Sequence, residues 1–170
     1  MSPEAAQAVA ADPREFRRAL GLYATGVAVV TTMAPGGERV GLTINSFASV
    51  SLDPPLILWS LAKTSPRLGL FSAASHFAVN ILSRDQEALC LRFSRPGEDR
   101  FAGLDTEAGA GGVPLVPGSL AQMECAREQV VDGGDHLILI GRVLRHRRTE
   151  GAEALVFCNG AFTGVPTRRN

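Results

Sequence analysis

The sequence predicts a mostly β protein, an antiparallel barrel with two or three short helices. Seven or eight apolar or alternating segments follow one another along the chain, and turns rich in glycine and proline separate them. The segments do not alternate regularly with helices, which argues against a doubly wound parallel sheet. The length of 170 residues fits one domain over 13–166, with a flexible leader at 1–12 and a short tail at 167–170.

Three capping signals predict where the helices begin. They are Asp12 before Pro13, Ser65 before Pro66, and Ser83 with Gln86 three positions later. A side-chain oxygen at these positions accepts a hydrogen bond from a free N–H of the first helical turn. The first helix is expected to end at about Tyr23.

The expected strands are identified by alternation or by runs of apolar and β-branched residues. They cover 27–33, 40–45, 56–61, 77–82, 121–131, 136–147, 154–157 and 161–164. The continuous apolar run Leu56–Leu61 predicts a strand buried on both faces, with Trp59 in the core. Residues 94–119 are rich in glycine, proline and charge and predict a long loop, a feature that is often functional.

The charge balance excludes several classes of function. Lysine plus arginine and aspartate plus glutamate each number 17, so no global basic field attracts nucleic acid or an anionic membrane. No apolar run approaches the roughly 20 residues of a membrane span. With no secretory signal pattern at the start, the expected location is the cytoplasm.

The three cysteines, Cys90, Cys125 and Cys158, form no CxxC pair. An odd count without such spacing predicts neither a disulfide framework nor a zinc site, and buried thiols are expected. His76 and His146 have no second ligand at metal spacing, so no metal site is predicted.

Short polar side chains gather between Thr43 and Ser51. Thr43 and Asn45 are expected on one strand face, and Ser49 and Ser51 on a face of the adjoining strand. Such a wall of donors and acceptors suits a flat heterocycle with carbonyl and ring-nitrogen edges. An ordinary solvent-facing strand surface accounts for the same pattern.

Lys63, Thr64 and Ser65 follow a buried strand and precede an expected helix. A cation, two hydroxyls and free N–H groups at a helix start can hold a phosphate. The alternative is an ordinary helix cap beside a surface lysine. His136, at the start of the last long strand, is either a substrate-facing imidazole or a histidine hydrogen-bonded within its turn.

Four arginines lie close together near the end of that strand, at 142, 145, 147 and 148. They fall on both strand faces, which is typical of an exposed edge protected by charge. A contact to a nucleotide phosphate is the second interpretation.

Several segments, in this order and spacing, resemble the flavin reductase-like family, the FMN-binding split-barrel proteins. The segments are Phe16–Val27, Thr43–Phe47 with Ser49–Ser51 and Asp53–Pro55, Phe77–Leu82, Asp99–Gly103, and Gly134–His136 with Ile140–Val143. The resemblance covers residues 14–165. One departure is Ala161-Phe162 after Gly160, where relatives often carry a tyrosine.

The resemblance implies a set of site residues. The isoalloxazine ring and ribityl chain would contact Thr43, Ile44, Asn45, Ser46, Ser49, Val50 and Ser51, and the flavin phosphate would contact Lys63, Thr64 and Ser65. Arg100 and Phe101 would reach the flavin or the nicotinamide nucleotide, and His136 would lie at the nicotinamide face.

The resemblance also implies an activity. The family comprises reductase components that use NADH or NADPH to reduce FMN or FAD and release the reduced flavin to a partner flavin-dependent monooxygenase. The proteins form homodimers. Two alternatives stay open: an enzyme that holds FMN tightly and reduces another acceptor, such as a cobalt corrin or a quinone, and a flavin-binding module without turnover. A purely structural dimer is disfavoured by the polar wall.

Overall fold

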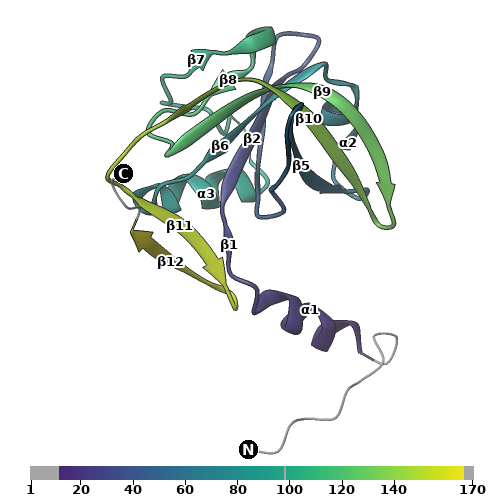
Figure 1. Ribbon diagram of the computed structural model, residues 1–170, viewed down its shortest axis with the longest axis vertical. Coiled ribbons are helices and arrows are strands. Elements are labelled where there is room, and N and C mark those ends of the chain that lie inside the picture. The colour runs from purple at the N-terminus through teal and green to yellow at the C-terminus, as the bar shows by residue number, and fades with distance from the viewer. Residues whose placement is uncertain (1–11, 98, 167–170) are drawn as a thin grey trace, which may run out of the picture.

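The computed structural model describes residues 12–97 and 99–166, and the predicted leader, apart from Asp12, and tail lie outside them. The described chain is mostly β with short helices, as predicted (Figure 1). The helices are α1 (Pro13–Gly21), α2 (Leu68–Ala73) and α3 (Glu87–Ser94), with single 3-10 turns at Arg84–Gln86 and Ala110–Gly112. The strands are β1 (Thr25–Gly26), β2 (Ala28–Met33), β3 (Arg39–Ile44), β4 (Ala48–Leu52), β5 (Pro55–Ala62), β6 (His76–Ile81), β7 (Glu107–Ala108), β8 (Pro114–Leu115), β9 (Ala121–Gly133), β10 (His136–Arg148), β11 (Glu153–Cys158) and β12 (Ala161–Pro166).

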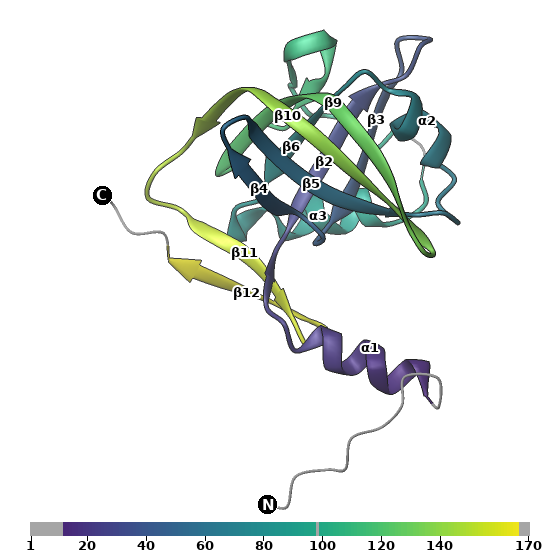
Figure 2. The ribbon, with the colours of Figure 1, turned by 45° about the vertical axis from the view of Figure 1, so that its right-hand side comes forward.

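Seven strands form one antiparallel sheet in the order β3-β2-β6-β9-β10-β5-β4. β3 and β4 follow each other in sequence, yet they are the two outer strands of this order. The sheet therefore curls (Figure 2), and a connection of only three residues joins its two edges. The two strands follow each other in sequence but do not pair: β3 pairs with β2, and β4 pairs with β5.

The connection between the two edges is held by one side chain. The Ser46 hydroxyl donates to the Ser60 carbonyl (3.1 Å) and accepts from the Ser60 N–H (3.0 Å). A polar side chain here replaces the ladder hydrogen bonds that the strand edges lack.

The largest core lies inside the curl of the sheet. The Trp59 side chain is fully buried and meets the rings of Phe71 and Phe77 edge-on, with centroid distances of 5.2 and 5.8 Å. Along β5 full burial alternates with partial burial, so the strand expected to be buried on both faces is fully buried on one only. An apolar run does not distinguish these two cases.

A second apolar cluster lies between the sheet and α3. Its members are Val27, Val29, Leu82, Cys90, Phe93, Phe101, Val116 and Leu155. The predicted capping signal precedes this helix: the Gln86 side chain accepts from the Ser83 N–H at 3.2 Å, and one 3-10 turn leads into α3.

Residues 94–119 were expected to be a long loop, and the described part contains β7, β8 and a 3-10 turn. A buried polar network fastens it to the main sheet. Asn80 Oδ1 accepts from the Val116 N–H (2.9 Å) and from Gln122 Nε2 (3.1 Å), and Thr31 Oγ1 donates to the Pro114 carbonyl (2.5 Å). Buried polar groups of this kind require partners, and here they fix the path of the segment.

The two ends of the domain lie together. α1 begins as predicted, because Asp12 Oδ1 accepts from the N–H groups of Arg14 (2.8 Å) and Glu15 (3.4 Å). The helix ends at Gly21, two residues before the expected boundary, and buries none of its side chains. β1 pairs with the hairpin of β11 and β12, which extends with α1 away from the main sheet (Figure 1).

The cysteines are free thiols. Burial raises the pKa of Cys125 to about 12 and also raises the pKa of Cys90, so both remain protonated near neutral pH. Cys158 is only half-buried, against the expectation of three buried thiols. Within the described chain, no helix is both long enough and apolar enough to cross a bilayer.

Candidate functional site

The predicted polar segments meet where β5 ends. Ala62 pairs with His136 across the β5–β10 ladder, and the Lys63 N–H donates to the Asp135 carbonyl at 2.8 Å. Ser46 is attached to Ser60, two residues before Ala62. The fold thus brings together three of the predicted groups: the β3–β4 connection, the segment after β5 and the tip of the β9–β10 hairpin.

Two of the predicted hydroxyls are used by the fold itself. Thr43 Oγ1 donates to the Cys90 carbonyl at 2.6 Å and so ties β3 to α3, while Ser46 is bonded to Ser60. A hydroxyl has one proton to donate, so these two groups are left with acceptor capacity only. Ile44 is buried in the main core.

Other polar side chains of the predicted set remain unengaged. Asn45, Ser49, Ser51 and Thr64 have no side-chain partner within the described chain, and all except Ser51 are exposed. A bulge separates Ser49 from Ser51 and leaves Val50 46% exposed. Because a bulge interrupts simple alternation, the shared face expected for the two serines does not follow from their spacing.

Lys63 is paired with the hairpin tip. Its Nζ lies 2.6 Å from Asp132 Oδ2. This hydrogen bond, followed by one from the Gly134 N–H, lowers the pKa of Asp132 below its ordinary value. A phosphate at Lys63 would have to compete with this carboxylate.

The helix after Ser65 begins later than expected. The Ser65 hydroxyl accepts from the Arg67 N–H at 3.3 Å, and α2 starts at Leu68 and has six residues. Ser65 therefore caps a turn that precedes the helix. A helix of this length contributes little dipole, which weakens the argument for a phosphate held by its N-terminus.

His136 lies beside the same cluster with its side chain 43% exposed. Its Nδ1 is 2.7 Å from Asp135 Oδ1. A carboxylate can only accept, so this contact assigns the proton to Nδ1 and leaves Nε2 free toward a ligand. The hydrogen bond from His136 is the main cause that lowers the pKa of Asp135.

Arg100 and Phe101 are buried, which the sequence did not indicate. Arg100 is 9% exposed and donates to the carbonyls of Gly41 (3.1 Å), Phe93 (3.0 Å) and Arg95. The Phe101 ring is 2% exposed and meets Phe93 edge-on at 4.9 Å. Phe101 is thus a core residue in this structure, and both Arg100 and Phe101 also line a cleft.

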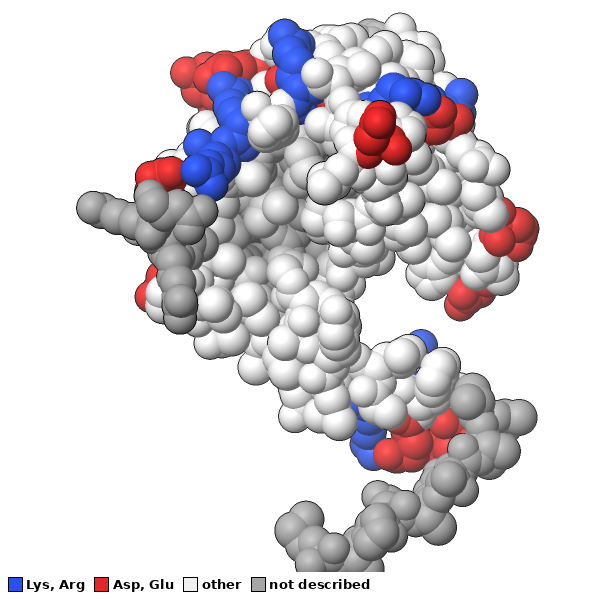
Figure 3. Space-filling view, viewed as in Figure 1, with Lys and Arg blue, Asp and Glu red and all other residues white. Residues whose placement is uncertain are grey.

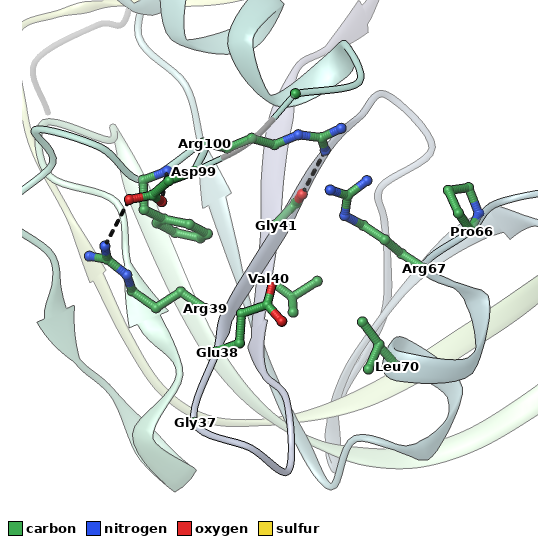
Figure 4. Close-up of a pocket in the computed structure, with 12 residues that line it drawn as sticks. Gly37, Glu38, Arg39, Val40, Gly41, Pro66, Arg67, Leu70, Asp99 and Arg100 are labelled. Atoms are coloured by element: carbon green, nitrogen blue, oxygen red, sulfur yellow. Dashed lines mark hydrogen bonds and ion pairs between the residues drawn. The ribbon is translucent and has the colours of Figure 1, made fainter.

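That cleft has a volume of about 630 Å³ and lies between β3, the start of α2, and residues 97 and 99–101 (Figure 4). A smaller cavity of about 200 Å³ includes Thr43, Ile44 and Asn45 in its lining. The larger cleft contains Arg67, which the sequence interpretation missed. The available signal in the sequence was that Arg67 follows the predicted phosphate segment by two residues.

The arginines near the end of β10 are paired: Arg145 with Glu124 (2.6 Å), Arg147 with Glu107 (2.8 Å) and Arg148 with Glu150 (3.1 Å). β10 pairs with β5 only as far as Arg142, so the arginines beyond it lie on a free strand edge, as predicted. The described residues contain no cluster of three or more potential metal ligands.

The structure combines a curled antiparallel sheet, unengaged amide and hydroxyl groups at Asn45, Ser49, Ser51 and Thr64, and a cleft whose lining includes three arginines. The sequence profile described as "Flavin reductase like domain" matches residues 20–166. The chain therefore belongs to the flavin reductase-like family. The predictions of the family, the mostly β fold and the enzyme class are confirmed.

Individual relatives agree with this assignment. The chain is 53% identical over 149 residues to the FMN reductase (NADH) SmoA of Agrobacterium fabrum, covering 88% of this chain and 84% of that protein. It is 48% identical over 149 residues to the reductase component of the flavin-dependent trigonelline monooxygenase of Acinetobacter baylyi, covering 88% of this chain and about half (48%) of that protein. The solved NADH:FAD oxidoreductase SgcE6 of Streptomyces globisporus, in complex with NAD and FAD fragments, has a TM-score of 0.87 at 36% identity and covers 94% of this chain and 96% of that chain.

Proposed function

We propose that the protein uses NADH to reduce FMN or FAD and passes the reduced flavin to a separate flavin-dependent monooxygenase. The observation that carries this proposal is the meeting of three segments at the end of β5: the β3–β4 connection, bonded through Ser46, the segment that starts at Lys63, and the hairpin tip with His136. The relatives support the cofactors, because their names specify FMN, FAD and NADH.

The residues of the site fit a flavin. The amide of Asn45 can both donate and accept, as the ring carbonyls and nitrogens require, and the hydroxyls of Ser49, Ser51 and Thr64 suit a ribityl chain. These side chains have no partner within the described chain, so a ligand breaks no existing bond. A flavin held by these residues would supply the redox chemistry, as the acceptor of a hydride.

The protein's own part is to position the two rings. The Asp135 carboxylate holds the His136 imidazole in one orientation through Nδ1, which leaves Nε2 as a donor or acceptor for the nicotinamide side. Orientation of this kind lowers the entropic barrier to transfer. The exposure of Asn45, Ser49 and Thr64 suits a flavin that leaves after reduction.

Purified protein should oxidise NADH only when FMN or FAD is added, with a rate that saturates as free flavin increases. Absorbance of the nicotinamide band measures this directly and reports the preferred flavin. Absence of oxidation with any flavin, in folded protein, would exclude the reductase and leave a binding module. If the protein is purified with FMN bound and its rate of NADH oxidation does not change when flavin is added, the alternative with tightly held FMN is favoured.

Asn45→Ala should raise the flavin KM about fivefold, because one or two hydrogen bonds to the ring are lost. Gln129→Ala, at an exposed position of β9, is the matched control and should leave the flavin KM unchanged. Equal KM values for wild type and Asn45→Ala would remove Asn45 from the flavin site.

A homodimer is also part of the proposal. Large apolar side chains are exposed at Phe16 and Leu20 on α1, at Leu22 and Tyr23 after it, and at Leu52 on β4. Figure 3 shows a mostly uncharged, hollowed face between α1 and the main sheet. Monomeric proteins rarely expose apolar patches of this extent, and a second copy would cover them.

The cytoplasmic location belongs to the proposal as well, since free thiols suit a reducing compartment.

Light scattering after size exclusion should therefore give twice the 18.0 kDa mass of one chain. Leu20→Arg should shift the population toward monomer, because a charge would be buried at the interface. Arg14→Gln, on the same helix, serves as the control. A wild-type monomer at all concentrations would contradict the homodimer.

A further inference from the structure

Lys63 differs in type from every other cationic side chain of the protein. Lysine and arginine together number 17 in the sequence, and Lys63 is the only lysine among them. It directly follows β5, where its N–H donates to the Asp135 carbonyl at 2.8 Å and its Nζ lies 2.6 Å from Asp132 Oδ2. Both acceptors belong to the tip of the β9–β10 hairpin, which projects at the edge of the molecule (Figure 1). The single lysine therefore links the end of β5 to this tip.

The ion pair of Lys63 and Asp132 is accessible to solvent. The Lys63 side chain is 38% exposed and the Asp132 side chain is 72% exposed. Ion pairs in such positions contribute little to stability, because water solvates both groups when they separate. Lys63 can therefore exchange Asp132 for another anion with little loss of stability.

A second ion pair on the same hairpin shows what an arginine does. Arg142 donates to Glu128 through Nε at 3.0 Å and through Nη2 at 2.7 Å, so its planar head group holds one carboxylate with two bonds. The ammonium of lysine is a compact charge on a flexible stem and has no such fixed geometry. Lys63 donates to one oxygen of Asp132. Lysine thus suits a cation that changes its partner, while Arg142 suits a permanent pair.

Asp132 keeps its place when Lys63 leaves. The Gly134 N–H donates to Asp132 Oδ1 at 3.0 Å, so the turn itself holds the carboxylate. Asp135 on the same tip has its own partner in His136; that hydrogen bond is the main cause that lowers the pKa of Asp135, and the charge of Lys63 lowers it further. Asp132 therefore stays as a fixed negative charge beside Lys63 and competes with any anion that approaches.

We propose that Lys63 moves between Asp132 and the phosphate of the flavin, and that Asp132 thereby weakens flavin binding. The inference rests on the proposed function, because that function supplies a phosphorylated flavin as the ligand. A reductase that releases its reduced flavin needs a bound state that is easily lost. Asp132 is an internal anion that takes Lys63 back as the flavin leaves, so it determines the affinity by acting through Lys63.

The test is an equilibrium titration of wild type and Asp132→Asn with FMN, FAD and riboflavin, each without nicotinamide nucleotide. Asparagine keeps the size of the side chain and an oxygen for the Gly134 N–H, but it removes the charge. The phosphorylated flavins should bind about threefold more tightly to Asp132→Asn, since a competing exposed carboxylate has a modest effect. Riboflavin, which has no phosphate, should bind both proteins equally. Glu128→Gln removes a carboxylate whose partner is Arg142 and should change none of the affinities.

The movement of Lys63 can be followed directly, because protein produced with lysine that carries 13C at Cε has one labelled side chain. Asp132→Asn should shift the NMR signal of Lys63 in the ligand-free protein. Addition of FMN to wild type should shift this signal further than addition of riboflavin. The FMN complexes of wild type and Asp132→Asn should give nearly the same signal, since Lys63 is then on the phosphate in both.

Tighter binding of the phosphorylated flavins alone supports the proposal. Equal affinities of wild type and Asp132→Asn overturn it, as does an equal gain for riboflavin, because the competition is then not for a phosphate. Weaker binding of FMN and FAD by Asp132→Asn also overturns it and would make Asp132 a group that holds Lys63 ready for the ligand. A Lys63 signal that FMN shifts no more than riboflavin does overturns the movement. Wild-type protein that binds none of the three flavins overturns the proposed function and this proposal with it.

Discussion

Replacing Trp59 with alanine is expected to lower the free energy of unfolding by about 3–5 kcal/mol. The side chain is fully buried, and both Phe71 and Phe77 rest edge-on against it. Its removal opens a cavity inside the curl of the sheet, where the strands are held from both sides and cannot collapse. Thermal and urea unfolding followed by circular dichroism measure the loss, since Trp59 is the only tryptophan.

Trp59→Phe is the matched control for this loss. The indole Nε1 is buried and has no hydrogen-bond partner among the described residues, so the native side chain carries the cost of an unsatisfied donor. Phenylalanine keeps an aromatic ring against both neighbours and removes that donor. We expect a loss of about 1 kcal/mol or less, and similar losses in both variants would contradict this account of the core.

The local features of this fold were predictable because their causes are local. The β9–β10 hairpin follows from alternating segments on either side of the turn Asp132–Asp135, and the structure has strands at Ala121–Gly133 and His136–Arg148. The start of α1 follows from Asp12, whose side chain caps the first turn. In each case the determining atoms lie within a few residues of one another.

Features that depend on distant partners were not predictable. The β3–β4 connection joins opposite edges of the sheet, and the bond from Ser46 to Ser60 that holds it has no signature in either segment. Burial along β5 depends on which face of the curled sheet meets the core. The path of the described part of residues 94–119 is fixed by Asn80, which accepts a hydrogen bond from the Val116 N–H. In the sequence, Asn80 is only one polar position in an apolar strand.

The candidate site shows the same difference between local features, which the sequence predicts, and features set by distant partners, which it does not. Its polar residue types were visible in the sequence, and the fold brings Lys63 and His136 together at the end of β5. The sequence did not reveal which cations are free. Arg39, Arg67 and Arg100 are the same residue type in the sequence. Within the described chain, the structure shows Arg39 paired with a carboxylate, Arg67 without a side-chain partner, and Arg100 buried with its guanidinium bonded to backbone carbonyls.

Replacing Arg100 with methionine is the second change expected to have a large effect, a loss of about 3 kcal/mol in the free energy of unfolding. Methionine has a similar length but no donor, so the carbonyls of Gly41, Phe93 and Arg95 lose the group that satisfies them. Of these, the Gly41 and Phe93 bonds are buried. Each buried carbonyl left without a donor costs about 1–3 kcal/mol, and relief from burying a charge offsets part of the sum. Urea unfolding monitored by tryptophan fluorescence measures the change.

Arg92→Gln is the control for Arg100→Met. Arg92 lies on α3 with its side chain exposed and donates to the Ala102 carbonyl at 3.0 Å, so it joins the same segments from the solvent side. Loss of a surface contact of this kind changes the free energy of unfolding by about 0.5 kcal/mol or less. Comparable losses of stability in the two variants would mean that burial does not increase the contribution of the Arg100 hydrogen bonds. An Arg100→Met protein as stable as wild type would show that residues 99–101 are held by the Phe101 ring in the core and not by the bonds of Arg100.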